Sequence, residues 1–163
     1  MFREMRRKKQ ALPLDACMEI LHRGTSGVLA LSGDKDYPYA VPLSYACEDG
    51  KIYFHSAAEG HKIDAISKNQ KASFCVIDQD QVIAEEYTTY FRSVIAFGRV
   101  KMVTDEEEKR RVIQRLAARY SPNEPEERTQ QAIGREWAQL CILELTMEHI
   151  SGKEALELVK EKR

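Results

Sequence analysis

Residues 39–62, YAVPLSYACEDGKIYFHSAAEGHK, constrain the fold more than any other part of the chain, because they read as a β-hairpin that continues into a helix. Apolar side chains recur at every second position on both sides of a turn, at Val41, Leu43 and Tyr45 and then at Ile52 and Phe54. This period of two is typical of strands with one buried face. Glu48-Asp49-Gly50 suits the turn, because glycine tolerates a positive φ and aspartate caps its own backbone. The sequence therefore predicts two antiparallel strands followed by a short helix at residues 61–68.

The start of that helix carries positive charge where negative charge is usual. The first turn of a helix presents unpaired N–H groups and a partial positive charge, so acidic side chains are favoured there. Here the first turn begins with His61 and Lys62. A bound phosphate would explain them, because free N–H groups, the Ser56 hydroxyl and Lys62 would then surround one anion. The alternative is a solvated surface turn, in which Gly60 is an ordinary loop residue.

The run PYAVPLSYACEDGKIYFHSAAEGHKIDAISKNQKASFCV resembles the flavin-binding split-barrel superfamily of pyridoxamine 5′-phosphate oxidase. The most similar branch is that of nitroimidazole-resistance and related FMN-binding proteins. The segments MFREMRRKKQ and ISGKEAL resemble this branch too, so the resemblance spans about residues 1–153. It implies a mainly β fold, a six-stranded antiparallel split β-barrel with peripheral helices, in one FMN-binding domain of residues 1–163. It also implies a homodimer with FMN in two clefts between the subunits.

The resemblance assigns cofactor-binding roles to particular residues. The strand whose backbone lies along the flavin ring is matched by Val41, Pro42, Leu43 and Ser44. The strand end beside the ribityl chain and phosphate is matched by His55, Ser56 and Ala57. The phosphate clamp is matched by His61 and Lys62, and a polar strand position that reaches the cofactor by Ser93, with Arg92 as its neighbour.

The activity that the resemblance implies is an FMN-dependent oxidoreductase. A reduced nicotinamide, NADH or NADPH, would deliver hydride to the flavin, and a small oxidised acceptor such as a nitro compound or quinone would receive the electrons. His55 is the candidate catalytic residue, because the most similar branch places a histidine of this motif beside the flavin; a structural histidine is the alternative. A flavin-binding or sensing protein without turnover, and a haem- or deazaflavin-binding relative, are the rival interpretations. Stable NAD binding is not expected, since no G-x-G-x-x-G motif is present.

Two departures argue against the activity in the superfamily's name. Pyridoxamine 5′-phosphate oxidase carries Arg-Lys at the phosphate clamp, where this chain has His61-Lys62. The arginine and histidine cluster that holds that enzyme's substrate phosphate has no counterpart in the C-terminal ISGKEALELVKEKR. Synthesis of pyridoxal phosphate is therefore not expected.

Composition excludes several other classes of function. The net charge of the 163 residues is −1, so no global field attracts nucleic acid or a membrane surface, and the basic cluster at residues 3–9 is read as a solvated arm. No stretch approaches the roughly 20 apolar residues that span a bilayer, and no signal peptide is evident, so a cytoplasmic protein is expected. No metal site is expected, because the cysteines form no C-x-x-C pair and suit buried free thiols: Cys17, Cys47, Cys75 and Cys141.

The rest of the chain predicts barrel strands and covering helices. Strands are expected at residues 26–31, 72–77, 90–103 and 137–150, with loops at 78–86 and 122–128. One helix should be capped by Asp15 and end near Gly24. Another should begin at Thr104, with Glu107 completing a capping box, and end near Ser121-Pro122. Trp137 either packs at a strand start or stacks near the partner subunit's flavin.

Overall fold

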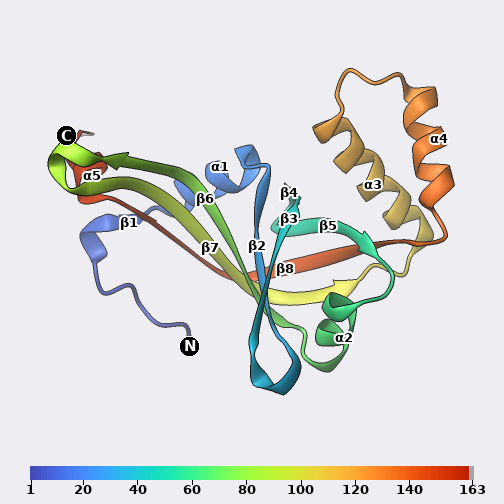
Figure 1. Cartoon of the computed structure of the whole chain (residues 1–163), viewed down its shortest axis with the longest axis horizontal. Coiled ribbons are helices and arrows are strands. Elements are labelled where there is room, and N and C mark those ends of the chain that lie inside the picture. The colour runs from blue at the N-terminus through green and yellow to red at the C-terminus, as the bar shows by residue number, and fades with distance from the viewer. Residues whose placement is uncertain (162–163) are drawn as a thin grey trace.

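In a computed structural model of the chain, which describes residues 1–161, eight strands form one antiparallel sheet (Figure 1). The strands are β1 (Ala11–Leu12), β2 (Ser26–Ser32), β3 (Pro38–Ser44), β4 (Ala46–Glu48), β5 (Lys51–Ala57), β6 (Lys71–Ile83), β7 (Thr88–Met102) and β8 (Leu140–Glu154). The α-helices are α1 (Leu14–Arg23), α2 (His61–Lys68), α3 (Glu106–Tyr120), α4 (Glu126–Glu136) and α5 (Leu156–Glu161). Short 3₁₀ turns are η1 (Lys8–Gln10), η2 (Asp34–Asp36) and η3 (Ala84–Glu86). None of the helices within residues 1–161 is both long and apolar enough to cross a bilayer.

The sheet curls into a barrel that stays open along one seam. The strand order is β3-β2-β6-β7-β8-β5-β4, and the two-residue β1 pairs with β8. β3 approaches β5 across the seam, but no ladder joins them in the described part of the chain. The predicted split-barrel fold is confirmed. Its six long strands are the six that were expected, and the two additional strands, β1 and β4, have only two and three residues.

Alternate side chains of β5 and β8 belong to two different apolar clusters, one on each face of the sheet. Phe54 and Leu143, which are register partners, are fully buried in the cluster inside the barrel. Tyr53 and Ile142, one residue along each strand, belong to the second cluster, which α3 and α4 cover. Successive strand residues point to opposite faces, so one pair of strands serves both clusters. Each large side chain buried in this way contributes about 1.5–3 kcal/mol of transfer free energy.

The helix predicted at residues 61–68 is present as α2, whereas the predicted N-caps of α1 and α3 are displaced by two residues and by one residue. Pro13 rather than Asp15 is the N-cap of α1, and the Asp15 carboxylate accepts a hydrogen bond from the next backbone N–H at 2.8 Å. Asp105 rather than Thr104 caps α3, because the Asp105 Oδ1 accepts from the Glu108 backbone N–H at 2.8 Å. The capping box of Thr104 with Glu107 is therefore wrong. The inward face of α1 carries the buried Cys17, Ile20 and Leu21.

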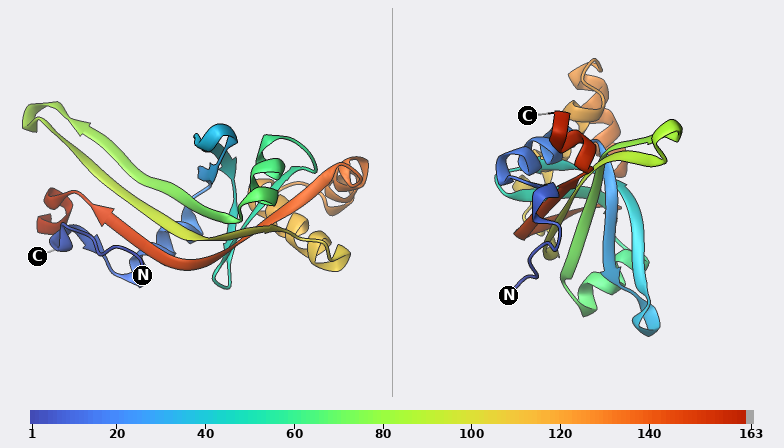
Figure 2. Two further views of the ribbon diagram at one scale, coloured as in Figure 1. Left: turned by 90° about the horizontal axis from the view of Figure 1, so that it is seen from below. Right: turned by 90° about the vertical axis from the view of Figure 1, so that its left-hand side faces the viewer.

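Larger corrections concern residues 78–86 and 122–139. The first segment is not a loop, because β6 continues to Ile83 and pairs with β7 in a long hairpin that extends well beyond the barrel (Figure 2). A register shift between Ile77 and Gln79 leaves Asp78 as a bulge in that hairpin. The second segment contains α4, which begins after Pro125, so the last strand starts at Leu140 instead of Trp137. Trp137 ends α4 and packs beneath Lys109 and Arg110 of α3.

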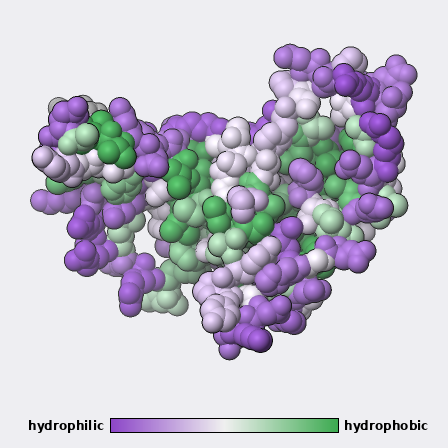
Figure 3. Space-filling model, in the orientation of Figure 1, coloured by the Kyte–Doolittle hydropathy of each residue, from purple (hydrophilic) through white to green (hydrophobic). Residues whose placement is uncertain are grey.

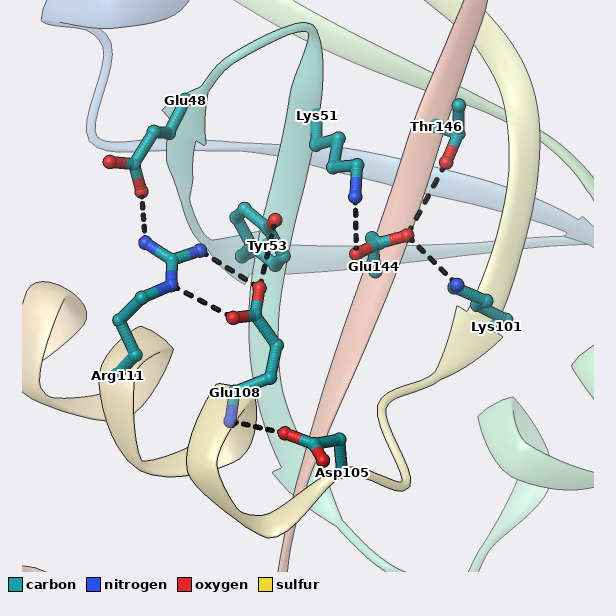
Figure 4. Close-up of polar contacts among 9 residues, drawn as sticks. All are labelled: Glu48, Lys51, Tyr53, Lys101, Asp105, Glu108, Arg111, Glu144 and Thr146. Carbon is teal, nitrogen blue, oxygen red and sulfur yellow. Dashed lines mark hydrogen bonds and ion pairs between the residues drawn. The ribbon is translucent and has the colours of Figure 1, made fainter.

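A polar network attaches the first half of α3 to the sheet (Figure 4). The Arg111 guanidinium donates to both oxygens of Glu108 at 2.9 Å and to Glu48 of β4 at 2.8 Å. On the same face of the sheet, Glu144 of β8 is buried and binds Lys51 at 3.1 Å and Lys101 at 3.3 Å. Burial alone would raise the pKa of the Glu144 carboxyl, but the two ion pairs outweigh it and hold the pKa below the usual 4.5.

We expect Glu144→Gln to lower the free energy of unfolding at pH 7 by about 1.5–3 kcal/mol, the range for a charged hydrogen bond. Because the folded pKa of Glu144 lies below its unfolded value, its stabilisation is present above about pH 4.5 and is lost as the pH falls through the folded pKa. The difference between wild type and Glu144→Gln should therefore shrink in acid. Urea unfolding at pH 7 and pH 3.5 measures both effects.

Glu148→Gln is the matched control, because Glu148 lies on the same strand and pairs with Arg99 at 3.1 Å, but both side chains are largely exposed. It should change the free energy of unfolding by less than about 0.5 kcal/mol. Equal effects of the two substitutions, or a difference that grows in acid, would contradict the role given to Glu144.

Candidate functional site

Two of the residues predicted to contact a cofactor meet in one pocket. Ser44 at the end of β3 and His55 on β5 both line a cavity of about 390 Å³ between the sheet and the α3–α4 pair. Both side chains are exposed and lie on the outer face of the barrel, where Tyr53 also points. Ser44 and His55 therefore meet across the seam. The hairpin predicted from residues 39–62 forms only as the short β4–β5 ladder, because β3 pairs with β2 instead of with β5.

The start of α2 has the backbone expected of an anion site. Gly60 is the N-cap, with φ 116° and ψ 176°, a region that residues with a Cβ rarely adopt. No side chain caps this helix. The N–H of Ile63 already donates to the Gly60 carbonyl at 2.9 Å, so the N–H groups of His61 and Lys62 are the ones that this end of the helix offers to a ligand. Glycine is needed here for its backbone conformation, since a Cβ at this position would meet no neighbouring atom.

Ser56 and Lys62 supply a hydroxyl and a cation near this helix start. Ser56 is buried, and its Oγ makes no hydrogen bond of ordinary geometry, although it lies beside the Cys141 thiol, its register partner on β8. Burial raises the pKa of Cys141, while the Ser56 hydroxyl and the charges of Lys62 and Lys109 act in the opposite direction. Lys62 therefore lies within electrostatic range of the Ser56–Cys141 pair. Among the side chains of residues 1–160, none forms an ion pair with Lys62.

His61 is directed away from Ser56, toward the β2–β3 hairpin. Its ring stacks on Tyr39, with 4.0 Å between ring centroids, and its Nε2 lies 3.8 Å from the Asp34 carboxylate. Lys68 at the other end of α2 also pairs with Asp34, at 3.2 Å. Asp34, at the tip of the β2–β3 hairpin, therefore contacts residues at both ends of α2. Of the two residues predicted to clamp a phosphate, His61 is therefore already in contact with Asp34, whereas Lys62 has no acidic partner among the described side chains.

β3 offers an unpaired backbone edge next to this pocket. Val41 and Leu43 point inward and pack against the barrel core, whereas Pro42 and Ser44 point outward and are exposed. Among the described strands, β3 pairs only with β2, so about half of its N–H and C=O groups face the open seam. Ala57, at the end of β5, is exposed on the same face as His55. A planar ligand at the seam would have backbone donors and acceptors along one side.

Ser93 lies far from this group within one chain. It pairs with Lys153 of β8, whereas His55 pairs with Ile142, more than ten residues and roughly 35 Å away along the same strand. Its neighbour Arg92 is occupied by ion pairs with Asp78 at 3.2 Å and Glu154 at 3.1 Å. The carboxyl of Asp78 also accepts two hydrogen bonds from Arg23, which holds its pKa below the usual range. Ser93 could share a ligand with His55 only if another subunit supplied one of them.

Sequence reasoning assigned no role in a pocket to the residues of α3 and α4 that form its helical wall. Tyr120 at the end of α3 lines it, and its hydroxyl accepts a 2.8 Å hydrogen bond from the Tyr45 N–H while lying against the carbonyls of Tyr45 and Thr25. Arg119 donates to the carbonyls of His22, at 2.7 Å, and Gly24. A Pro-Glu-Glu start at residues 125–127 is a usable helix signal that would have revealed the α4 wall.

The fold and this site define a split-barrel protein with an uncapped helix start at α2 and an apolar pocket between the sheet and the α3–α4 pair. The profile of the pyridoxamine 5′-phosphate oxidase family matches residues 13–154, and the chain belongs to that family. This confirms the family predicted from residues 39–62. No curated protein matches the chain.

Solved structures show the same fold. A protein of Bacteroides thetaiotaomicron, described as a candidate 5-nitroimidazole antibiotic resistance protein, superposes with a TM-score of 0.72 at 18% identity, over 88% of this chain and 86% of that one. An FAD-binding protein of Mesorhizobium loti gives 0.68 at 26% identity, over 90% and 97%. An FAD- and haem-binding protein of Mycobacterium smegmatis gives 0.73 at 20% identity, over 91% and 74%.

Proposed function

We propose that this protein binds FMN and is an oxidoreductase that passes electrons from a reduced nicotinamide to a small oxidised acceptor, such as a nitro compound or quinone. The observation that supports this most directly is the helix start at α2. There the helix has no side-chain cap, the buried Ser56 Oγ has no hydrogen-bond partner, and Lys62 forms no ion pair among the side chains of residues 1–160, a set of donors that suits a phosphate. Family membership adds support for the cofactor, but it gives much less information about the substrate.

The residues present fit FMN in three places. The phosphate would lie at the start of α2, with Ser56 and Lys62. The ring would lie along the open edge of β3, where backbone groups can bond its polar edge. His55 and Ala57 would flank the connecting ribityl chain. FMN supplies hydride and electron transfer, and the protein's part is to bind it, orient it and admit the acceptor.

FAD is the second candidate cofactor, because the 26% identical Mesorhizobium loti protein is described as FAD-binding. A haem-binding or deazaflavin-binding protein, and a flavin-binding protein without turnover, are rivals to the same proposal. The visible spectrum and mass of the ligand that copurifies distinguish all the cofactors. Oxidation of NADH or NADPH with and without 1,4-naphthoquinone distinguishes an enzyme from a binding protein, and absence of any flavin would overturn the proposal.

Lys62→Ala should weaken FMN binding by about 1.5–3 kcal/mol, because it removes a charged hydrogen bond to the phosphate. Riboflavin, which lacks the phosphate, should lose little affinity. Lys68→Ala is the control, since Lys68 lies on the same helix but is exposed and pairs with Asp34. Flavin-fluorescence titration measures all of these affinities, and equal losses for FMN and riboflavin would place Lys62 away from the phosphate.

The outer face of the barrel supports the homodimer. Side chains of β2, β3, β6 and β7 that point away from the core are largely apolar and incompletely buried: Val28, Ala30, Pro42, Cys75, Ile77 and Ile95. Ser93 lies on this same face, one strand position from the buried Val94. A second copy packed here would cover the apolar surface and could bring its Ser93 to the first copy's cofactor.

We therefore expect a dimer that FMN stabilises, because a ligand shared by two subunits favours the associated state. Sedimentation of apo and FMN-loaded protein at graded concentrations measures this. Val28→Glu should dissociate the dimer and lower FMN occupancy, whereas Leu14→Glu, at an exposed apolar position on α1, should do neither. A monomer that binds FMN stoichiometrically at micromolar concentration would refute the shared site.

His55 is the proposed proton donor to the acceptor, because it is an exposed histidine in the pocket beside the cofactor edge. His55→Ala should leave FMN occupancy nearly unchanged and slow quinone-dependent reoxidation by about 10²-fold. Reduction by NADH should change much less, since hydride transfer to the flavin needs no protein acid. Stopped-flow absorbance follows both half-reactions, with His22→Ala as the control. Loss of FMN would make His55 a binding residue, and unchanged rates would make it structural.

A further inference from the structure

The pocket that contains His55 has an apolar floor and a polar mouth. Its floor is formed by four buried side chains from α3, α4 and β8: Ile113, Leu116, Ile133 and Leu140. Its mouth carries the more exposed Ser44, His55, Tyr120 and Glu136. Figure 3 shows apolar residues between the α3–α4 pair and the sheet, with hydrophilic residues around them. This division is typical of a small-molecule site, in which apolar area supplies affinity and a few polar groups fix orientation.

The pocket walls are held in place independently of any ligand. The end of α3 is fixed by Tyr120 and Arg119, which bond to backbone groups of the α1–β2 connection and the β3–β4 junction. The start of α3 is fixed by Arg111 through Glu48. α4 is joined to α3 by Trp137, whose Nε1–H donates to Glu106 at 3.1 Å and whose ring lies under Lys109. A preformed cavity of this kind binds without a large ordering cost.

We propose that this pocket is the acceptor site, and that it takes an uncharged apolar molecule of one or two rings, such as a naphthoquinone. The inference rests on the proposed function, because it needs a reduced cofactor beside His55. The volume of about 390 Å³ lies at the lower end of the range for small-molecule sites, which excludes large acceptors. The wall residues Ala117 and Ala132 leave this space open, and they set the size of acceptor that enters.

The reaction at this site balances as NADH plus H⁺ plus quinone giving NAD⁺ plus hydroquinone. The nicotinamide loses a hydride, which carries two electrons, and the quinone gains those two electrons and two protons. The hydride supplies both electrons and one of the two protons. The second proton comes from His55 or from water. Both quinone carbonyls become hydroxyls, and no other oxidant or reductant is required.

The charge at the pocket mouth selects among acceptors by their charge, in addition to the selection by size. Of the residues that line the pocket, Glu136 is the one with a carboxyl side chain. A carboxylate at the entrance repels an anionic acceptor and leaves a neutral one unaffected. Because Glu136 is exposed, solvent screens it, and discrimination of only about two- to fivefold is expected from this charge.

The test measures the affinity of the FMN-containing protein for 1,4-naphthoquinone. Quenching of the Trp137 fluorescence by the quinone reports the binding. Trp137 is the chain's one tryptophan and packs against the same apolar cluster as the pocket floor. Ala117→Phe should weaken quinone binding at least tenfold, because its ring fills the cavity. Ala118→Phe is the matched control on the adjacent exposed position outside this pocket, and it should change binding less than twofold. FMN occupancy should be unchanged in both.

Ala132→Phe fills the cavity from the opposite wall and should weaken quinone binding as Ala117→Phe does. The same effect from two different helices would show that the loss comes from filling the cavity and not from a local folding defect in α3. Glu136→Gln should improve binding of 1,4-naphthoquinone-2-sulfonate about two- to fivefold and leave the neutral quinone unchanged. Equal losses for Ala117→Phe and Ala118→Phe would overturn the proposal. Loss of FMN or FAD in the pocket-filling variants would also overturn it, since the cavity would then hold the cofactor. A wild-type protein that binds quinone but no flavin would refute the proposed function and leave the pocket as a quinone site.

Discussion

The pairing of β5 with β8 determines most of the structure, because its two faces support the two apolar clusters. On one face, Phe54 and Leu143 close the barrel interior; on the other, Tyr53 and Ile142 form the surface on which α3 and α4 pack. A change of register by one residue would exchange these faces and place both sets of side chains wrongly. The position of His55 follows from the same register, since it shares the outer face with Tyr53 and so enters the pocket. The candidate site and the fold therefore both depend on one strand pair.

The open seam has a cost and a use. An unpaired strand edge exposes backbone donors and acceptors that would otherwise be bonded, and β3 presents such an edge. Closing the barrel would satisfy these groups but would remove the place where a planar ligand can lie. The exposed Pro42 within β3 is compatible with this arrangement, because proline is tolerated at edge positions and supplies no N–H to a further strand. The unpaired edge of β3 and its proline therefore both lie next to the candidate site.

What could be predicted from the sequence was mainly local. The strands at residues 39–57, their turn and the helix at 61–68 follow from alternation, a glycine-containing turn and a short amphipathic run, and these elements are present. The predicted pairing is mostly wrong, because β3 pairs with β2 and only the three residues of β4 pair with β5. The extension of β6 to Ile83 could not be predicted in this way, because its polar residues are held in the strand by pairing with β7 and not by burial. The start of α3 was misplaced because Thr104 and Asp105 are both good N-caps, and only the backbone geometry selects Asp105.

The candidate site was predictable where it depends on the strand–helix junction and unpredictable where it depends on distant elements. Ser56, Gly60 and Lys62 are neighbours in sequence, so their convergence could be anticipated. The helical wall of the pocket brings residues 113–136 against residues 44 and 55, and nothing in either segment specifies the other. The separation of Ser93 from His55 is likewise a property of strand length and curvature, which short motifs do not encode.

The two basic residues at the start of α2 illustrate how the structure refines a motif. A cation at this position opposes the helix dipole, by up to about 1 kcal/mol, if no anion is present. Asp34 and Tyr39 hold the His61 side chain against the β2–β3 hairpin, and the Asp34 carboxylate compensates any positive charge on the ring. Lys62 has no such compensation among the described side chains, so its unfavourable position can be offset only by a ligand or by solvent. The same argument explains why the first position of the pair can differ from the Arg-Lys of pyridoxamine 5′-phosphate oxidase. A residue that anchors the helix need not be a strong phosphate ligand, provided that the backbone N–H groups, Ser56 and Lys62 remain available to the anion.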